Sequence, residues 1–173
     1  MYEIGNQEVL AIKKIISKGK LFRYLENSEC EFFEKNYAKY LSIKHTALAS
    51  SGTAALTAAL VGLKIGPGDE VLIPAHTYMA TAMSVLSVGA IPVIIDIDES
   101  LTIDPKALED ACGPQTRAAI VVHMWGTACN MNAIMKIAKK INLFVIEDAS
   151  QSVGVGIEKK MLGTIGNVGA FSF

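Results

Sequence analysis

The chain has 173 residues, 51% of them hydrophobic, with 16 basic residues against 17 acidic ones. This length is enough for one domain with a real core, and the balanced charge gives no electrostatic reason to expect nucleic acid or an anionic membrane as a partner. No apolar run reaches the roughly 18 residues of a membrane span, and the N-terminus lacks the basic and apolar regions of a secretion signal.

The cysteines and histidines show no pattern of a disulfide framework or a metal site. Three cysteines are widely spaced and lie outside any CxxC motif: Cys30, Cys112 and Cys129. They are typical of the reduced thiols of a cytoplasmic protein. His45, His76 and His123 also lack the spacing of metal ligands, so we expect no bound metal.

Two helices are predicted near the N-terminus. Apolar residues recur at helical spacing over residues 8–18 and again over residues 28–41. Ser28 is a candidate N-cap for the second helix, with Glu31 completing a capping box. We expect residues 1–41 to form a helical segment that packs on the rest of the chain.

After residue 41, short apolar runs alternate with helical stretches. The expected strands cover residues 47–49, 71–73, 92–97, 118–122, 143–146 and 168–173, and the expected helices cover residues 53–63, 77–88, 105–111 and 131–140. This alternation predicts an α/β domain over residues 42–173, with a mainly parallel sheet between two layers of helices. Glycines in the last thirty residues predict turns or a hairpin before the final strand.

The segment Ser50–Leu56, with the sequence Ser-Ser-Gly-Thr-Ala-Ala-Leu, predicts a phosphate site. It joins the apolar run at 46–49 to a helix-forming run through small polar residues. A strand, a tight turn and a helix in that order leave unpaired amide groups and the positive end of a helix dipole at one sheet edge, which is a site for an anion.

A second segment, Val145–Gln151, ends an apolar strand with two carboxylates, Glu147 and Asp148. Ligands bind at the carboxyl ends of parallel strands. A phosphate cradle and an acid at the same edge could hold a phosphorylated, basic heterocycle from both ends.

Other short motifs accompany these two segments along nearly the whole chain. They are Phe33-Glu34-Lys35, Ile65–Val71, Pro74–Tyr78, Gly89–Val93, His123 with Gly126, and Ala170–Phe173. In this order and spacing the set resembles the large domain of the DegT/DnrJ/EryC1/StrS family of pyridoxal-phosphate (PLP) aminotransferases. The resemblance implies fold type I, that of aspartate aminotransferase, and Leu21–Tyr24 is similar to members that aminate keto-sugars and keto-inositols.

The resemblance also implies roles for individual residues. The amides of Gly52, Thr53 and Ala54 would bind the PLP phosphate, with help from Ser172. Tyr78 would stack on the pyridine ring. Asp148 would keep the ring nitrogen protonated, which makes the ring a better electron sink, and Gln151 would lie on the side of the cofactor hydroxyl.

Three residues around these motifs have a less defined place. His76 and Trp125 are candidates for lining the substrate pocket, and His123 lies at a strand end. Asn130 stands where many family members have Asp before Met, and we expect this difference to affect a turn and not the chemistry.

In the family, the Schiff-base lysine lies a few residues beyond the Ala-Phe-Ser-Phe strand, and this sequence ends at Phe173. Lys159 and Lys160 are typical of a solvated hairpin and not of a substitute. We therefore expect the chain alone to be inactive, as the N-terminal part of a longer enzyme or as half of a split enzyme whose other polypeptide brings the lysine and the small domain. Uncovered apolar surface and a final strand at 170–173 without its continuation predict association, with a dimer as the family's arrangement.

Two other functions remain open. A non-catalytic PLP-binding or regulatory module would keep the cradle and Asp148 and need no lysine. A nucleotide-binding α/β domain would also have a phosphate-binding turn, although the chain has neither G-x-G-x-x-G nor a Walker motif.

Overall fold

The computed structural model describes residues 4–173 and divides into two units, one ending at Leu48 and the other spanning Ala49–Phe173. The first unit holds helices α1 (Asn6–Lys18) and α2 (Glu29–Leu41). As predicted, Ser28 caps α2, because its hydroxyl accepts the amide of Glu31 at 3.2 Å. The Glu31 carboxylate reaches one residue further than in a capping box and accepts the amide of Asn27 at 2.7 Å.

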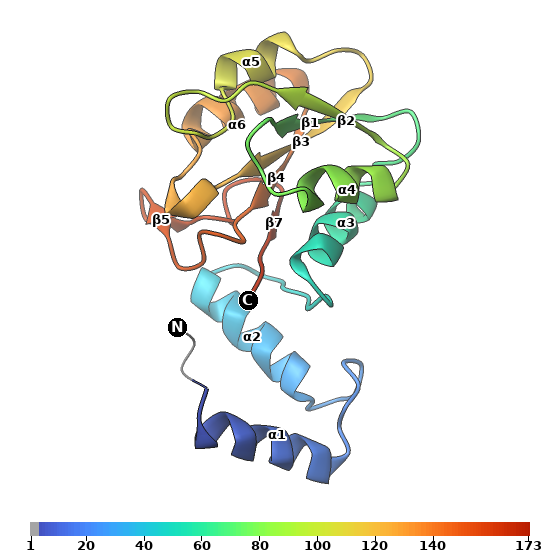
Figure 1. Ribbon diagram of the computed structural model, residues 1–173, viewed down its shortest axis with the longest axis vertical. Coiled ribbons are helices and arrows are strands. Elements are labelled where there is room, and N and C mark those ends of the chain that lie inside the picture. The colour runs from blue at the N-terminus through green and yellow to red at the C-terminus, as the bar shows by residue number, and fades with distance from the viewer. Residues whose placement is uncertain (1–3) are drawn as a thin grey trace. The chain divides into compact units, whose positions relative to one another are not determined.

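The second unit is built on a sheet of five parallel strands in the order β2-β1-β3-β4-β7 (Figure 1). The strands are β1 (Glu70–Pro74), β2 (Ile91–Ile95), β3 (Thr116–Val122), β4 (Phe144–Asp148) and β7 (Val168–Ala170). The chain runs from β1 outward to β2 and then returns to β3 on the other side of β1. Such a reversal opens a crevice at the carboxyl ends of the strands, where α/β sheets bind ligands.

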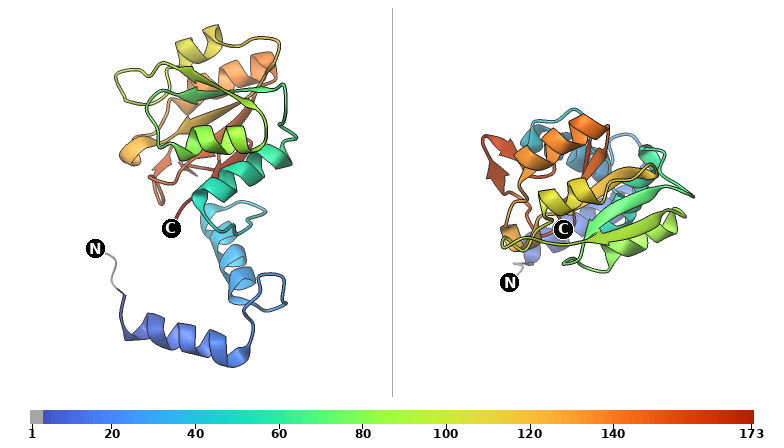
Figure 2. Two further views of the ribbon diagram at one scale, coloured as in Figure 1. Left: turned by 45° about the vertical axis from the view of Figure 1, so that its right-hand side comes forward. Right: turned by 90° about the horizontal axis from the view of Figure 1, so that it is seen from above.

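Helices cover both faces of this sheet, which confirms the predicted three-layer α/β fold (Figure 2). Helices α3 (Gly52–Gly62) and α4 (Ala80–Ser87) pack on one face. Helices α5 (Pro105–Asp110) and α6 (Met131–Ile141) pack on the other. A short antiparallel hairpin, β5 (Gly156–Ile157) with β6 (Lys160–Met161), precedes β7, as the glycines predicted.

Burial on both faces explains the continuous apolar runs of the strands. In β3, Ala118, Ile120 and Val122 pack under α3 and α4, while Ala119 and Val121 pack under α5 and α6. Alternate residues of one strand thus enter two separate cores.

The local sequence also defines helix α6. Its N-cap is Asn130, whose side-chain oxygen accepts the amide of Ala133 at 3.2 Å. Met131, Ile134 and Ala138 form the buried stripe. Asn130 therefore affects the start of a helix, and an Asp at this position could make the same cap.

Residues 47–49 do not form the predicted strand. They pair with none of the described strands, and the amide of Leu48 donates instead to the Glu34 carboxylate at 2.6 Å. An apolar tripeptide becomes a strand only where a neighbour completes its hydrogen bonds. The strands predicted over 92–97 and 168–173 are also shorter, ending at Ile95 and Ala170.

The same substitution at two sites tests the layered core. Leu108 in α5 is fully buried, whereas Leu86 in α4 is 54% exposed. We expect Leu108→Ala to lower the free energy of unfolding by about 2–5 kcal/mol, because it leaves a cavity. Leu86→Ala should cost less than about 1 kcal/mol. Denaturant unfolding of both variants measures the difference, and equal losses would contradict this packing.

Candidate cofactor site

A cavity opens at the carboxyl ends of β3 and β4, and residues from five segments line it. They come from the start of α3, the start of α4, the end of β3, the end of β4 with the turn that follows it, and the segment after β7. The predicted site residues among them are Gly52, Thr53, Tyr78, Asp148, Gln151 and Ser172. The cavity therefore joins the segments that the sequence analysis identified separately.

The start of α3 forms one wall. Ser51 is the N-cap, and its hydroxyl accepts the amide of Ala54 at 3.1 Å. Gly52 and Thr53 are the first two helical residues, so their amides have no carbonyl one turn earlier to bond to. Ala54 does not line the cavity and its amide is engaged by Ser51, so two amides remain for a ligand and not the three that were expected.

The backbone at Gly52 lies close to two hydroxyl groups. A Cβ at this position would be 3.0 Å from Cβ of Ser172 and 3.4 Å from the hydroxyls of Ser150 and Ser172. Only glycine leaves this space open without displacing Ser172. Amides and hydroxyls that converge at the N-terminus of a helix suit an anion. Ser150, which also lines the cavity, was missed by the sequence analysis; its position two residues after Asp148 was the available signal.

Asp148 lies across the cavity as the last residue of β4. It is only 8% exposed. One carboxylate oxygen accepts the amide of Ser150 at 3.1 Å, and within residues 4–173 Asp148 forms no ion pair. A nearly buried carboxylate without a cation is costly unless a ligand supplies the positive partner.

Tyr78 precedes α4 and also lines the cavity, with 73% of its surface exposed. Hydroxyl groups hold this wall in place. Thr77 and Thr81 are joined by a hydrogen bond of 2.7 Å, and Thr57 of α3 is joined to Ser87 of α4 at 3.2 Å. The second of these bonds connects the two helices whose first residues line the cavity, and the first is local to the start of α4.

His76 and Trp125 do not line the cavity itself, but they are linked to its rim. The side-chain oxygen of Gln151 accepts the amide of Trp125 at 3.2 Å. The Trp125 ring, 70% exposed, meets the His76 ring edge-on with centroids 5.1 Å apart. The His76 ring also contacts the carbonyl of Leu101 through Nδ1 at 3.1 Å.

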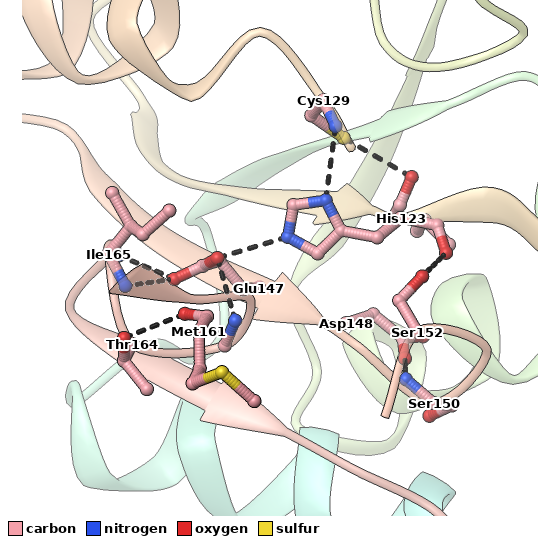
Figure 3. Close-up of polar contacts among 12 residues, drawn as sticks. His123, Cys129, Glu147, Asp148, Ser150, Ser152, Met161, Thr164 and Ile165 are labelled. Atoms are coloured by element: carbon pink, nitrogen blue, oxygen red, sulfur yellow. Dashed lines mark hydrogen bonds and ion pairs between the residues drawn. The ribbon is translucent and has the colours of Figure 1, made fainter. Parts of the chain in front are cut away.

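Glu147, next to Asp148, lies outside the cavity and is completely buried with His123 (Figure 3). The His123 Nδ1 accepts the amide of Cys129 at 3.1 Å, so Nε2 carries the proton and donates to Glu147 at 3.0 Å. Burial raises the pKa of Glu147, but hydrogen bonds from His123 and the amides of Gly166, Gly163 and Ile165 outweigh that effect and hold its pKa below the ordinary value of 4.5. His123 is thus a neutral partner of a buried carboxylate.

The described residues contain no cluster of side chains that could hold a metal ion. Burial raises the pKa of the Cys129 thiol to about 12, which makes it a poor nucleophile. No helix in residues 4–173 has the length and hydrophobicity to cross a bilayer.

Comparison with known proteins identifies the family of this arrangement. Residues 2–173 match the DegT/DnrJ/EryC1/StrS aminotransferase family. The chain belongs to that family. The resemblance inferred from the motifs is thereby confirmed.

Two curated relatives are sugar and cyclitol aminotransferases. The chain is 40% identical to dTDP-3-amino-3,4,6-trideoxy-alpha-D-glucose transaminase of Streptomyces venezuelae, over 99% of this chain and 45% of that protein. It is 37% identical to L-glutamine:2-deoxy-scyllo-inosose aminotransferase of Streptomyces kanamyceticus, over 94% of this chain and 39% of that protein. The chain thus spans less than half the length of these relatives.

Solved structures agree with this assignment. An aminotransferase from Psychrobacter cryohalolentis superposes with a TM-score of 0.94 at 35% identity, over 99% of this chain and 43% of that chain. NtdA from Bacillus subtilis, solved with its bound cofactor PMP, gives a TM-score of 0.81 at 35% identity, over 92% of this chain and 37% of that chain. These structural neighbours are PLP-dependent aminotransferases.

The lowered pKa of Glu147 predicts how acid affects the fold. A carboxylate whose pKa is lower in the folded than in the unfolded state contributes stability above its ordinary pKa and loses it as the pH falls through the folded value. The stability difference between wild type and Glu147→Gln should be full above pH 4.5 and shrink below it. Unfolding at a series of pH values measures this difference, with the exposed Glu99→Gln as control. A difference that stays constant down to about pH 3 would contradict the prediction.

Proposed function

We propose that this chain is the cofactor-binding part of a PLP-dependent aminotransferase that transfers an amino group from an amino-acid donor to a keto-sugar or keto-inositol. The observation that carries the proposal is the pairing, within one cavity, of an anion site at the start of α3 with the nearly buried, cation-free Asp148. A ligand that fits both ends has a phosphate on one side and a protonated ring nitrogen on the other. The family supports PLP as that ligand.

The phosphate end would be held by the amides of Gly52 and Thr53 and by hydroxyls. The missing side chain at Gly52 leaves room next to Ser150 and Ser172, whose hydroxyls lie 3.4 Å from where a Cβ would stand. The positive end of the α3 dipole adds attraction for a dianion. These residues fit a phosphate without a metal ion.

At the ring end, Asp148 would hold a proton at the pyridine nitrogen, and exposed Tyr78 would stack on the ring. Gln151 uses its side-chain oxygen to accept the Trp125 amide, which leaves its NH2 group to donate to the cofactor hydroxyl. When bound, PLP supplies the electron sink on which amino-group transfer depends. Asp148 strengthens that sink because it keeps the nitrogen charged in a nearly water-free position.

His76 and Trp125 form an aromatic wall beside the cofactor cavity, and we propose that it lines the acceptor site. Their edge-to-face contact and the hydrogen bond from Trp125 to Gln151 connect this wall with the cofactor end. An exposed indole offers a flat apolar surface on which the C–H groups of a sugar or cyclitol ring can pack. The sugar and inosose specificities of the two relatives support this class of acceptor.

The lysine that bonds to the cofactor would come from outside residues 1–173. No lysine among the described residues lines the cavity. Lys159 and Lys160 are exposed on the β5–β6 hairpin, as the sequence predicted. We propose that a C-terminal polypeptide brings the lysine and the small domain, and that the completed enzyme is a cytoplasmic dimer. Exposed apolar side chains on α1, including Val9, Ile12 and Ile16, are consistent with such association.

A second candidate function is a PLP-binding module without catalysis, because such a module would use the anion site and Asp148 and needs no lysine. Spectroscopy separates the two functions. We expect the chain with PLP to develop the absorbance of a covalent PLP–lysine bond only after addition of a polypeptide that contains the C-terminal part of a relative. Binding of PLP with no such band under either condition favours the module, and no PLP binding at all contradicts both.

Removal of one charge tests the role of Asp148. In the reconstituted enzyme, Asp148→Asn should lower kcat by about 10³-fold, because the neutral amide no longer stabilises a protonated ring nitrogen. The variant retains the shape of the side chain, so the melting temperature should change little. The control is Asp110→Asn, which removes an exposed carboxylate on α5 that pairs with Lys106. Activity of Asp148→Asn within a few-fold of wild type would reject the pyridinium role.

A further inference from the structure

Glu147 is a buried charge that the cofactor chemistry does not use. It is fully buried and does not line the cavity. Its carboxylate has no cationic partner among residues 4–173, since His123 uses Nδ1 as an acceptor and is therefore neutral. A buried ion of this kind does not by itself indicate a gain in stability. The groups that donate hydrogen bonds to Glu147 are therefore the guide to its role.

Three of these donors are backbone amides of one loop, between β6 and β7. Oε1 of Glu147 accepts the amides of Ile165 and Gly166, both at 2.6 Å. Oε2 accepts the amide of Gly163 at 2.9 Å, beside the imidazole of His123. Figure 3 shows the carboxylate between the imidazole and Ile165. One side chain of β4 thus satisfies three amides that would otherwise be buried without a partner.

The same loop is held tightly against the backbone of β4. The side-chain oxygen of Asn167 accepts the amide of Val145 at 2.8 Å, and the amide of Asn167 donates to the Val145 carbonyl at 2.8 Å. At Gly166 a Cβ would lie 2.7 Å from the Val145 carbonyl oxygen, so the loop cannot approach this closely with any other residue. The anchored loop leads directly into β7, whose register places Ala170 beside Asp148.

Ser172 follows Ala170 by two residues and lies next to the start of α3. Phe171 alone separates Ser172 from the end of β7, so the place of Ser172 depends on where that strand lies. A Cβ at Gly52 would be 3.0 Å from that of Ser172, so Ser172 already lies in tight contact with the backbone of Gly52. The position of the Ser172 hydroxyl therefore follows from the anchoring of residues 163–167.

We infer that Glu147 is a positioning residue for the phosphate end of the cofactor site: its carboxylate holds the loop 163–166 so that β7 presents the Ser172 hydroxyl at the N-terminus of α3. The inference rests on the proposed function, since it assigns Ser172 to a phosphate. Glu147 acts on one side of β4 while Asp148 serves the ring nitrogen on the other.

The substitution Glu147→Gln tests this role. In either orientation of the amide, its NH2 group faces two donors: the amides of Ile165 and Gly166, or His123 Nε2 and the amide of Gly163. Part of the loop anchor must therefore be lost, although the side chain keeps its size.

The measurement is the affinity of the 173-residue chain for pyridoxamine 5′-phosphate divided by its affinity for pyridoxamine, by calorimetric titration. This ratio isolates the contribution of the phosphate. We expect Glu147→Gln to lower the ratio about 10-fold, the effect of losing one hydrogen bond to a charged group. The affinity for pyridoxamine itself should change much less.

Leu108→Ala is the control for general destabilisation, because Leu108 is a fully buried residue of α5 and makes none of the hydrogen bonds that anchor the loop 163–166. It should leave the ratio unchanged. A second variant, Asn167→Ala, removes the side-chain oxygen that accepts the amide of Val145, and Asn167 is exposed. This variant should also lower the ratio, and it tests the inference even if Glu147→Gln does not fold.

The outcomes separate this inference from the proposed function. A wild-type ratio near one would show that the phosphate site is wrong, and the positioning role would fall with it. A high wild-type ratio that stays the same in Glu147→Gln, or in Asn167→Ala where the first variant is unfolded, would overturn the inference alone. An equal drop in Leu108→Ala would also overturn it, because general destabilisation would then explain the effect.

Discussion

Two neighbouring carboxylates at the end of β4 organise the site, because the alternation of a strand sends them to opposite faces of the sheet. Asp148 lies on the face of Ile146, which packs under α3 and α4, and it lines the cavity. Glu147 lies on the face of Val145, within the other core, and binds the amides of the loop before β7. One strand thus offers a charge to a ligand on one side and anchors the chain on the other.

The cavity depends on parallel strands that end at the same edge. The connections after β1, β3 and β4 all emerge there, and the start of α3 meets them. Its polar groups come from short turns, but the strands that support them are buried on both faces and therefore rigid. This arrangement suits the proposed cofactor, which would be held at both ends, because α3, which begins at Gly52, packs on the sheet that carries Asp148.

Glu147 and Asp148 are both buried carboxylates, but they differ in how far the chain itself satisfies their hydrogen bonds. Glu147 has all its hydrogen bonds from within the chain, and its pKa is accordingly lowered. Asp148 is almost as buried, but within residues 4–173 its side-chain hydrogen bonding is limited to the amide of Ser150. A satisfied carboxylate serves structure, whereas an unsatisfied one next to a cavity is suited to a cationic ligand.

The sequence by itself determined the α/β class, the order of most helices and strands, the N-cap at Ser28, and the family, because these depend on local periodicity, capping and short motifs. It also predicted a shared site for Gly52, Tyr78, Asp148 and Ser172, and the structure brings these four residues into one cavity. Only the tertiary structure decided that residues 47–49 are not a strand, that the amide of Ala54 is bonded to Ser51, and that Glu147 and His123 form a buried hydrogen-bonded pair. Strand pairing and the satisfaction of buried polar groups depend on partners far away in the sequence, and a local pattern does not specify those partners.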